Sequence, residues 1–229
     1  MLKDPSVLTI RRRFERPARE LMARLKGAQT GHIVDALQGR GALDHHVKPV
    51  VPERAHFVGP ALTCEAGAND NLAIMAALVL GEPGDVVIAA CDGFAATAVI
   101  GDNLAMMANN KGFAALVTDG MARDREGIVS AGIPVFARGI TPNSCVRSGP
   151  GKVGFAIVCG GVAVAPGDVV LGDRDGVVVI PQDELEVVVA RLDDIRRMEE
   201  ETQAKIRAGM THLDSVAQLL QSDKVAYVD

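Results

Sequence analysis

The sequence predicts a single α/β domain over residues 1–229, and three observations support this fold class. Apolar residues make up 48% of the chain, and a compact chain of this length buries roughly 70% of its unfolded surface, so one core can form. Helix and strand patterns alternate up to residue 118, whereas short strand patterns cluster from 134 to 180. No linker rich in serine, proline or charge separates these two parts.

The N-terminal region is expected to form a helical arm over about residues 1–28. Apolar side chains recur at helical spacing across residues 5–27, with a break near Pro17, and seven arginines and lysines lie among them. These cations form either a solvated face or a surface for an anion or a partner. A second short helix is expected from Thr30, as its N-cap, to Gly39.

The rest of the chain predicts strands that alternate with helices and then strands alone. Helices are expected after Asp70, as a cap, to Gly81, and over residues 103–110. Pro181 opens a C-terminal helix over about residues 182–209. The expected strands are 57–64, 85–90, 114–118, 134–137, 153–158, 162–165, 169–171 and 177–180.

Two segments repeat one turn-strand-turn pattern. PGDVVIAACDG at 83–93 and PGDVVLGDRDG at 166–176 agree at their first five positions and at the final Asp-Gly. We interpret them as the same turn and strand used twice rather than as a solenoid repeat. This pattern indicates two related layers around one core.

Composition excludes several classes of function. The formal charge of −5 is not that expected of a general nucleic-acid binder, and there is no run of 18 apolar residues that would cross a membrane. The N-terminal segment has no apolar stretch of the kind that a secretory signal requires, so a cytoplasmic location is expected. Seven aromatic side chains offer little surface for bases or sugars, which favours a small polar ligand.

The other motifs do not indicate a catalytic or ligand-binding site. GPGKVG at 149–154 fits the dinucleotide fingerprint, but a strand pattern follows it where a helix is needed. The four cysteines contain no CxxC pair and are expected to be reduced core thiols. The five histidines show no helical metal spacing, and His45 and His46 are expected on a loop surface.

The stretch GDNLAMMANNKGFAALVTDGMARDREG, residues 101–127, is the most informative one. A helix over 103–110 runs about 12 Å, and the five extended residues 114–118 return about 16 Å, so the start of the helix and the end of the strand meet at one edge. Asp102 should therefore approach Arg123 and Asp124 at the carboxyl edge of the sheet. Two carboxylates suit Mg²⁺, while a guanidinium and free helix amides suit an α-keto acid. The alternative that spacing leaves open is an aspartate helix cap beside a loop ion pair.

These residues resemble a known family. The spacing of Asp102 and the Arg123–Asp124 pair, with GDNLA, VTDGMARD, APGDVV and DRDGVVVIP, is similar to the class II pyruvate aldolases that cleave 4-hydroxy-4-methyl-2-oxoglutarate and 4-carboxy-4-hydroxy-2-oxoadipate. Non-catalytic relatives of the regulator of ribonuclease E activity A share that fold. The resemblance runs from about residue 30 to 209 and implies a layered α/β/β sandwich of the swivelling β/β/α, RraA-like type with N- and C-terminal helices.

For catalysis, the resemblance implies a divalent metal, Mg²⁺, Mn²⁺ or Co²⁺. Asp124 would bind the metal directly, and Asp102 would bind it through water. Arg123 would bind the pyruvyl group and stabilise its enolate. The implied reaction releases pyruvate from a 4-hydroxy-2-oxo acid, with oxaloacetate decarboxylation as a side activity.

For substrate binding, the resemblance implies that Gly101 and the backbone amides of Asn103 and Leu104 hold the substrate carboxylate. Asn71 is expected in the same cleft. Glu199 matches a catalytic glutamate contributed across a subunit boundary, which implies a homotrimer or homohexamer with its active site at a subunit interface.

Two positions depart from the family pattern. Ala98 stands where the family usually has glycine, and Met75 stands where some members carry histidine. The extra methyl group of Ala98 affects the expected substrate shape more than metal binding. The competing function is a catalytically silent regulator that inhibits a protein partner, while a methyltransferase has no glycine-rich nucleotide loop to support it.

Overall fold

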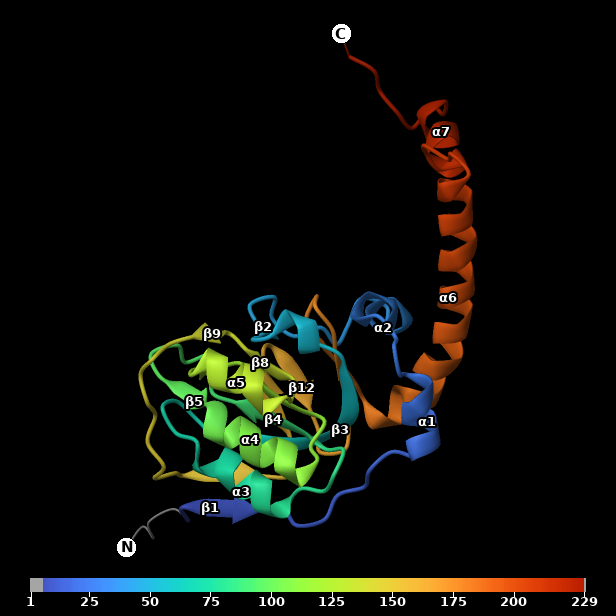
Figure 1. Cartoon of the computed structure of the whole chain (residues 1–229). Helices are drawn as coiled ribbons and strands as arrows, with labels where there is room; N and C mark the ends of the chain where they lie inside the picture. The colour runs from blue at the N-terminus through green and yellow to red at the C-terminus, as the bar shows by residue number, and fades with distance from the viewer. Residues whose placement is uncertain (1–5, 229) are drawn as a thin grey trace, which may run out of the picture.

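The structure is a computed structural model that describes residues 6–228. A mixed sheet lies at its centre (Figure 1). Its four middle strands, β3, β4, β6 and β8, are parallel, and β2, β10 and β1 extend its edges in the order β1-β10-β3-β4-β6-β8-β2. The strands span Leu8–Ile10 (β1), Lys48–Pro49 (β2), Phe57–Glu65 (β3), Val86–Ala90 (β4), Ala115–Thr118 (β6), Val135–Ala137 (β8) and Gly151–Val153 (β10). Every residue of β4 and β6 is buried, as expected of parallel strands covered on both faces.

Three helices cover one face of this sheet: α3 (Leu72–Leu80), α4 (Asp102–Lys111) and α5 (Arg125–Ala131). Their small buried side chains, such as Ala77, Ala105 and Ala108, let the helices lie close to β4 and β6 in one apolar core. Figure 1 shows the three helices together on this side of the sheet. Each helix lies in the connection between two neighbouring parallel strands of this sheet, β3 and β4, β4 and β6, or β6 and β8, so their shared face agrees with right-handed crossovers.

The opposite face is covered by strands. The hairpin of β11 (Ile157–Cys159) and β12 (Val162–Val164) packs there together with β13 (Val169–Gly172) and β14 (Val177–Ile180), which join the sheet through β3. The resulting order of helices, sheet and second strand layer is the α/β/β sandwich that the family resemblance implies.

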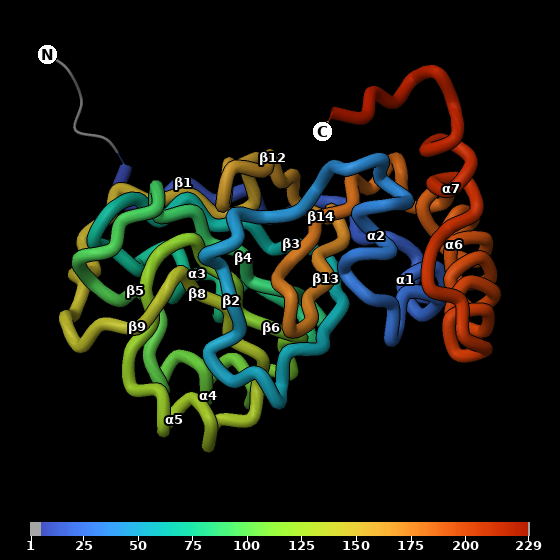
Figure 2. The backbone as a smooth tube through the Cα atoms, turned by 90° about the horizontal axis from the view of Figure 1, so that it is seen from above, coloured from blue at the N-terminus to red at the C-terminus, as the bar shows by residue number. Residues whose placement is uncertain are grey.

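A third core lies at one end of the body, where α1 (Arg19–Arg24), α2 (Thr30–Ala36) and α6 (Leu185–Arg207) pack around β13 and β14. The buried residues of α6 all lie between Leu185 and Leu192. Its later part extends away from the body and leads to α7 (Asp214–Leu220), as Figure 1 shows. Figure 2 shows α6 and α7 at the side of the body where α1 lies. Two 3₁₀ turns, Pro52–Arg54 and Gln182–Glu184, complete the elements, and α6 confirms the expected C-terminal helix.

Some local predictions were wrong. The expected helical arm over residues 1–28 is mostly not helical: Leu8–Ile10 forms strand β1 beside β10, α1 is short, and residues 1–5 lie outside the described residues. Pairing with an exposed sheet edge has overridden the helical spacing. Thr30 does not cap its helix but is its first residue, and its N–H and hydroxyl both donate to Asp173 at 2.8 Å. The expected strand 153–158 is divided between β10 and β11.

A small parallel sheet at the other end of the body positions the candidate site. It contains β5 (Ala98–Ile100), β7 (Met121–Ala122) and β9 (Gly139–Ile140). None of these strands was predicted, nor was α5. Among residues 6–228, no helix is both long enough and apolar enough to cross a lipid bilayer.

Candidate active site

A cavity of about 320 Å³ opens between the start of α4, the start of α3 and the small sheet. All six residues predicted to bind substrate line it: Asn71, Gly101, Asp102, Asn103, Leu104 and Arg123. Met75, Ala98, Val99, Met107, Ser144, Cys145 and Arg147 complete the lining. The wall is therefore mainly polar and contains two guanidinium groups.

Asp102 is the first residue of α4, and Gly101 is its N-cap. The Asp102 carboxylate accepts a hydrogen bond of 2.6 Å from the N–H of Asn103, so one of the amides expected to hold the substrate has an intramolecular partner. The remaining first-turn N–H groups of a helix lack intrahelical acceptors and favour an anion. Asp102 also lies against Gly127 of α5, where a β-carbon would approach the Asp102 β-carbon to 2.4 Å.

Arg123 lies in the cavity wall and is ion-paired to Asp124. Its N–H donates to Ile100 O at 2.9 Å, which fixes the chain beside β5, and its Nε lies 3.0 Å from Asp124 Oδ2. A second guanidinium nitrogen of Arg123 donates to the Ser144 hydroxyl. Asp124 itself adopts φ 57° and ψ 48° at the N-cap of α5 and lies at the edge of the cavity rather than in its lining.

Asn71 is a buried residue of the cavity wall. Its side-chain N–H donates to Val99 O at 3.1 Å, which fixes the orientation of the amide. Its Oδ1 has no hydrogen-bond partner. Every other buried side-chain nitrogen or oxygen in residues 6–228 has one. Because an unsatisfied buried acceptor costs free energy, this oxygen is suited to a water or a ligand hydroxyl group.

Glu199 is not brought to this cavity within its own chain. It lies in the exposed later part of α6, and its Oε1 accepts a hydrogen bond of 3.0 Å from Gln203. Figures 1 and 2 show α6 and β5 at opposite ends of the body. A role for Glu199 in this site therefore requires a second chain.

The segment around Ser144, Cys145 and Arg147 was not anticipated as part of the site. It arrives from a distant part of the sequence, through bridges that pair Ser144 with Ala98 and Val146 with Asp70. Asp70 is buried, and its Oδ2 accepts the Gly149 N–H at 2.9 Å. The sequence offered no periodic signal here, because the segment is neither a helix nor a regular strand.

The cysteines differ from one another in their surroundings. All four are free, as expected, and Cys64, Cys91 and Cys159 are buried, but Cys145 is half-buried in the cavity wall and so is not a core thiol. Burial raises the pKa of Cys91 to about 12, and partial burial raises the pKa of Cys145 above its ordinary value.

The donor atoms in and beside the cavity fit a hard divalent cation. Asp102 and Asp124 supply carboxylates at the starts of neighbouring helices, and Asn71 offers an unpartnered amide oxygen. A methyl group added to Gly101 would lie 3.3 Å from Asp124 Oδ2, so the Asp124 carboxylate reaches the loop that begins α4. Mg²⁺ commonly binds one or two carboxylates and keeps several waters, so two aspartates can hold it.

The fold and this site define a member of an α/β/β family that includes aldolases. The family model named RraA-like and described as Aldolase/RraA matches residues 30–179, and the chain belongs to this family. A protein of Halalkalibacterium halodurans named "Putative 4-hydroxy-4-methyl-2-oxoglutarate aldolase" is 35% identical over 189 residues, which are 82% of this chain and 88% of that protein.

Solved structures agree with this assignment. The RNA-processing inhibitor RraA from Thermus thermophilis is 33% identical with a TM-score of 0.59, over 67% of this chain and 93% of that one. RraAS2 of Streptomyces coelicolor, an unusual member of the RNase ES inhibitor RraA protein family, is 27% identical with a TM-score of 0.70, over 83% of this chain and all of that one. The family thus contains proteins named for catalysis and proteins named for inhibition.

Proposed function

We propose that the chain is a metal-dependent carbon–carbon lyase that releases pyruvate from 4-hydroxy-4-methyl-2-oxoglutarate or 4-carboxy-4-hydroxy-2-oxoadipate. Oxaloacetate decarboxylation is its side activity, because both reactions pass through the enolate of pyruvate. The single observation that carries the proposal is that Asp102 and Arg123 line one cavity, with Asp124 ion-paired to Arg123 at its edge. The aldolase named from Halalkalibacterium halodurans supports the same reaction class.

The proposed metal is Mg²⁺, Mn²⁺ or Co²⁺, bound by Asp124 directly and by Asp102 through water. When bound, it would polarise the 2-oxo group and carboxylate of the substrate. The guanidinium of Arg123 binds the pyruvyl end and stabilises the negative charge that develops on its 2-oxygen as the C3–C4 bond breaks. The free amides at the start of α4, with that of Leu104 among them, attract the substrate carboxylate.

The proton of the C4 hydroxyl must leave as the bond breaks, and C3 of the enolate must then gain one. Among the described residues, neither histidine nor lysine lines the cavity, so the base is a water held beside the Asp102 carboxylate. Asn71 Oδ1 offers an acceptor that can orient a hydroxyl group. The water that takes the proton of the C4 hydroxyl then returns a proton to C3 of the enolate, so the protons balance without a Schiff base.

The cavity suits a substrate with more than one carboxylate. Arg147 supplies a second guanidinium in the wall, separate from the pair formed by Arg123 and Asp124. A substrate whose two ends are both anionic can use both cations, whereas an aromatic substrate finds only aliphatic and polar side chains in this wall.

We also propose that the site is completed between chains in a homotrimer or homohexamer. Glu199 is exposed on α6, and this helix lies at the opposite end of the body from β5 and the cavity, so its carboxylate would act in the cavity of a neighbouring chain. In that arrangement Glu199 of the partner subunit acts in the site formed by Asp102 and Arg123.

The test is the rate of pyruvate formation, coupled to lactate dehydrogenase, with each hydroxy-oxo acid and with oxaloacetate, in the presence and absence of Mg²⁺. We expect metal-dependent pyruvate from the wild-type protein. Asp124→Asn should lower kcat/KM by at least about 100-fold because it removes a charged metal ligand, whereas Asp223→Asn, at an exposed position in the C-terminal segment, should be unchanged.

A second candidate function is inhibition of a protein partner, because the RraA of Thermus thermophilis is named an RNA-processing inhibitor. Absence of metal-dependent pyruvate with all three substrates would contradict the lyase proposal and leave this function as the better one. An Asp124→Asn rate equal to that of the wild type would show that Asp124 is not the metal ligand.

A further inference from the structure

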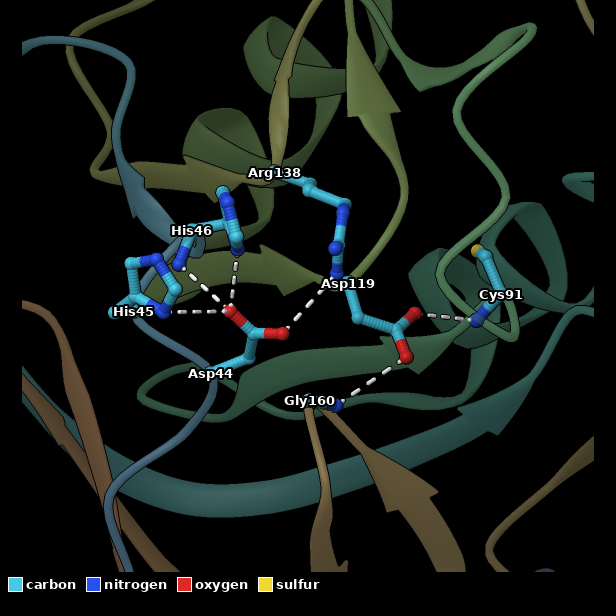
Figure 3. Close-up of polar contacts among 7 residues, drawn as sticks. All are labelled: Asp44, His45, His46, Cys91, Asp119, Arg138 and Gly160. Atoms are coloured by element: carbon cyan, nitrogen blue, oxygen red, sulfur yellow. Dashed lines mark hydrogen bonds and ion pairs between the residues drawn. The ribbon is translucent and has the colours of Figure 1, made fainter.

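A second cluster of polar side chains lies in the loop between α2 and β2. Asp44 Oδ1 lies 2.8 Å from His46 Nδ1 and 3.4 Å from His45 Nδ1. Figure 3 shows both imidazole rings turned towards this one oxygen. Within residues 6–228, no other three histidine, cysteine or acidic side chains bring their ligand atoms within 4.8 Å of one another.

The Asp44 carboxylate is held in place from several sides. The Asp44 N–H donates to Gly160 O at 2.8 Å, and Gly160 is fixed in turn by its own N–H, which donates to Asp119 at 3.2 Å. The His46 N–H donates to Asp44 Oδ1 at 2.8 Å, and Arg138 donates to Oδ2 at 3.3 Å (Figure 3). Oδ1 therefore faces the two histidines while the guanidinium occupies the other oxygen.

The donor set differs in kind from that of the candidate active site. Two imidazole nitrogens and one carboxylate are typical ligands of Zn²⁺ and other late divalent metals, whereas Asp102 and Asp124 offer oxygen alone. A tetrahedral Zn²⁺ site with bonds of about 2.0–2.1 Å has ligand–ligand separations of about 3.3 Å. The separation of 3.4 Å between His45 Nδ1 and Asp44 Oδ1 is close to this value, whereas the 2.8 Å between His46 Nδ1 and Oδ1 is a hydrogen bond that must lengthen by about 0.5 Å as the ion enters.

The cluster is open to solvent, so that an ion and a water can enter. Two hollows of about 310 and 390 Å³ flank it, and His45 lines both. Lys48, Arg125 and Arg138 line the larger hollow, which raises the alternative of an oxyanion site. The carboxylate of Asp44, which both rings face, disfavours an anion at that point and favours a cation.

We propose that Asp44, His45 and His46 bind a late divalent metal ion such as Zn²⁺, with water as the fourth ligand. This site is independent of the proposed lyase activity, because it shares no residue with the cavity around Asp102.

The test is calorimetric titration of Zn²⁺ into the tag-free, full-length protein, kept in millimolar Mg²⁺ to occupy the oxygen-rich site. Loss of an outer-shell partner alone weakens metal binding about 10–100-fold, so His45→Ala and His46→Ala should each weaken Zn²⁺ binding by at least that factor. His56→Ala, at an exposed histidine outside the cluster, and Asp124→Asn should keep wild-type affinity. Visible absorption of bound Co²⁺ should show the same pattern, with tetrahedral band intensity lost in the two cluster variants.

Two results would overturn the proposal. One is Zn²⁺ affinity that survives both histidine substitutions. The other is binding of inorganic phosphate, but not of Zn²⁺, that is lost in Arg138→Ala, which would assign the cluster to an anion. Because the side chain of His45 is 82% exposed, His45→Ala keeps the test decisive even if His46→Ala disturbs the loop, and circular dichroism checks the fold of each variant.

Discussion

The contact between Asp102 and Gly127 shows how one missing side chain shapes the candidate site. Asp102 begins α4, and Gly127 belongs to α5. A β-carbon on Gly127 would lie 2.4 Å from the β-carbon of Asp102 and 2.7 Å from its Oδ2. Glycine is thus needed here for the close approach of two helices, although its φ is not positive.

We expect Gly127→Ala to displace the Asp102 carboxylate and to lower kcat/KM. Alanine in a helix is itself worth about 0.5–1 kcal/mol over glycine, so the clash should reduce activity more than it reduces stability. The matched control is Gly31→Ala, at a helical glycine with nothing within 4 Å of the new methyl group. Steady-state kinetics and thermal unfolding measure both effects, and equal kinetics for the two variants would contradict this role.

Cys145 should report occupancy of the cavity without any assay of turnover. It is half-buried in the cavity wall, whereas Cys64, Cys91 and Cys159 are buried. Because partial burial raises the pKa of Cys145, alkylation at pH 7 should be slow, and it should quicken as the pH rises and the thiolate forms. We expect iodoacetamide to modify Cys145 first, and pyruvate with Mg²⁺ to protect it. Mass spectrometry of the peptides measures both, and labelling that pyruvate leaves unchanged would place the ligand elsewhere.

At the scale of elements, long and strongly patterned segments could be predicted and short ones could not. The apolar run of β4 and the helical spacing of α6 indicated the correct elements. Strands β5, β7 and β9 have two or three residues each, too few to show a period. Strand β1 carries a helical pattern but pairs with β10, because an available sheet edge outweighed local preference.

The same distinction holds for the candidate site. The return path through α4 and β6 predicted that Asp102 approaches Arg123, and both line the cavity. Ser144 and Arg147 reach it through a loop without regular structure, whose place depends on long-range bridges to β5 and Asp70. Similarly, helical spacing could not show that adjacent loop histidines would turn towards Asp44.

The two PGDVV segments form the same turn, which is closed by an aspartate side chain in each. In each, the aspartate accepts a hydrogen bond from the N–H three residues before it: Glu82 N to Asp85 at 2.9 Å, and Ala165 N to Asp168 at 2.8 Å. The strands that follow, β4 and β13, both pair with β3. The repeated sequence therefore corresponds to two equivalent turns, one on either side of β3, the longest strand.

Asp168 should make stability depend on pH in a direction opposite to that of most carboxylates. Burial raises its pKa in the folded protein, although two backbone N–H groups act against this. Its stabilising contribution is therefore largest below the unfolded pKa and falls as the pH rises through the folded pKa. Because a side-chain amide does not titrate, we expect Asp168→Asn to reduce the free energy of unfolding more at pH 4 than at pH 7. Urea unfolding at both pH values measures this, and a larger loss at pH 7 would show the opposite sign.

At the scale of the whole molecule, the candidate site and the C-terminal helix lie at opposite ends of the body. The cavity lies by β5 and β7, and α6 packs against α1 and α2 at the other end. One chain therefore cannot join Glu199 to its own cavity, and an assembly is needed if both act together.

We expect Asp124→Asn and Glu199→Gln to complement each other when mixed. If each site takes Arg123 and Asp124 from one chain and the partner's Glu199, a mixed assembly contains some sites with neither substitution. Refolding the two inactive variants together should restore part of the pyruvate-forming activity, whereas refolding either one alone should not. Full activity of Glu199→Gln by itself would remove this residue from the reaction.

The projecting part of α6 also affects how the particle moves in solution. A helix of 23 residues is about 35 Å long, and only its first eight residues hold buried side chains. Such an arm adds hydrodynamic drag out of proportion to its mass if it stays free, and adds little if a neighbouring chain covers it. The ratio of sedimentation coefficient to mass therefore reports whether the arm is free or docked.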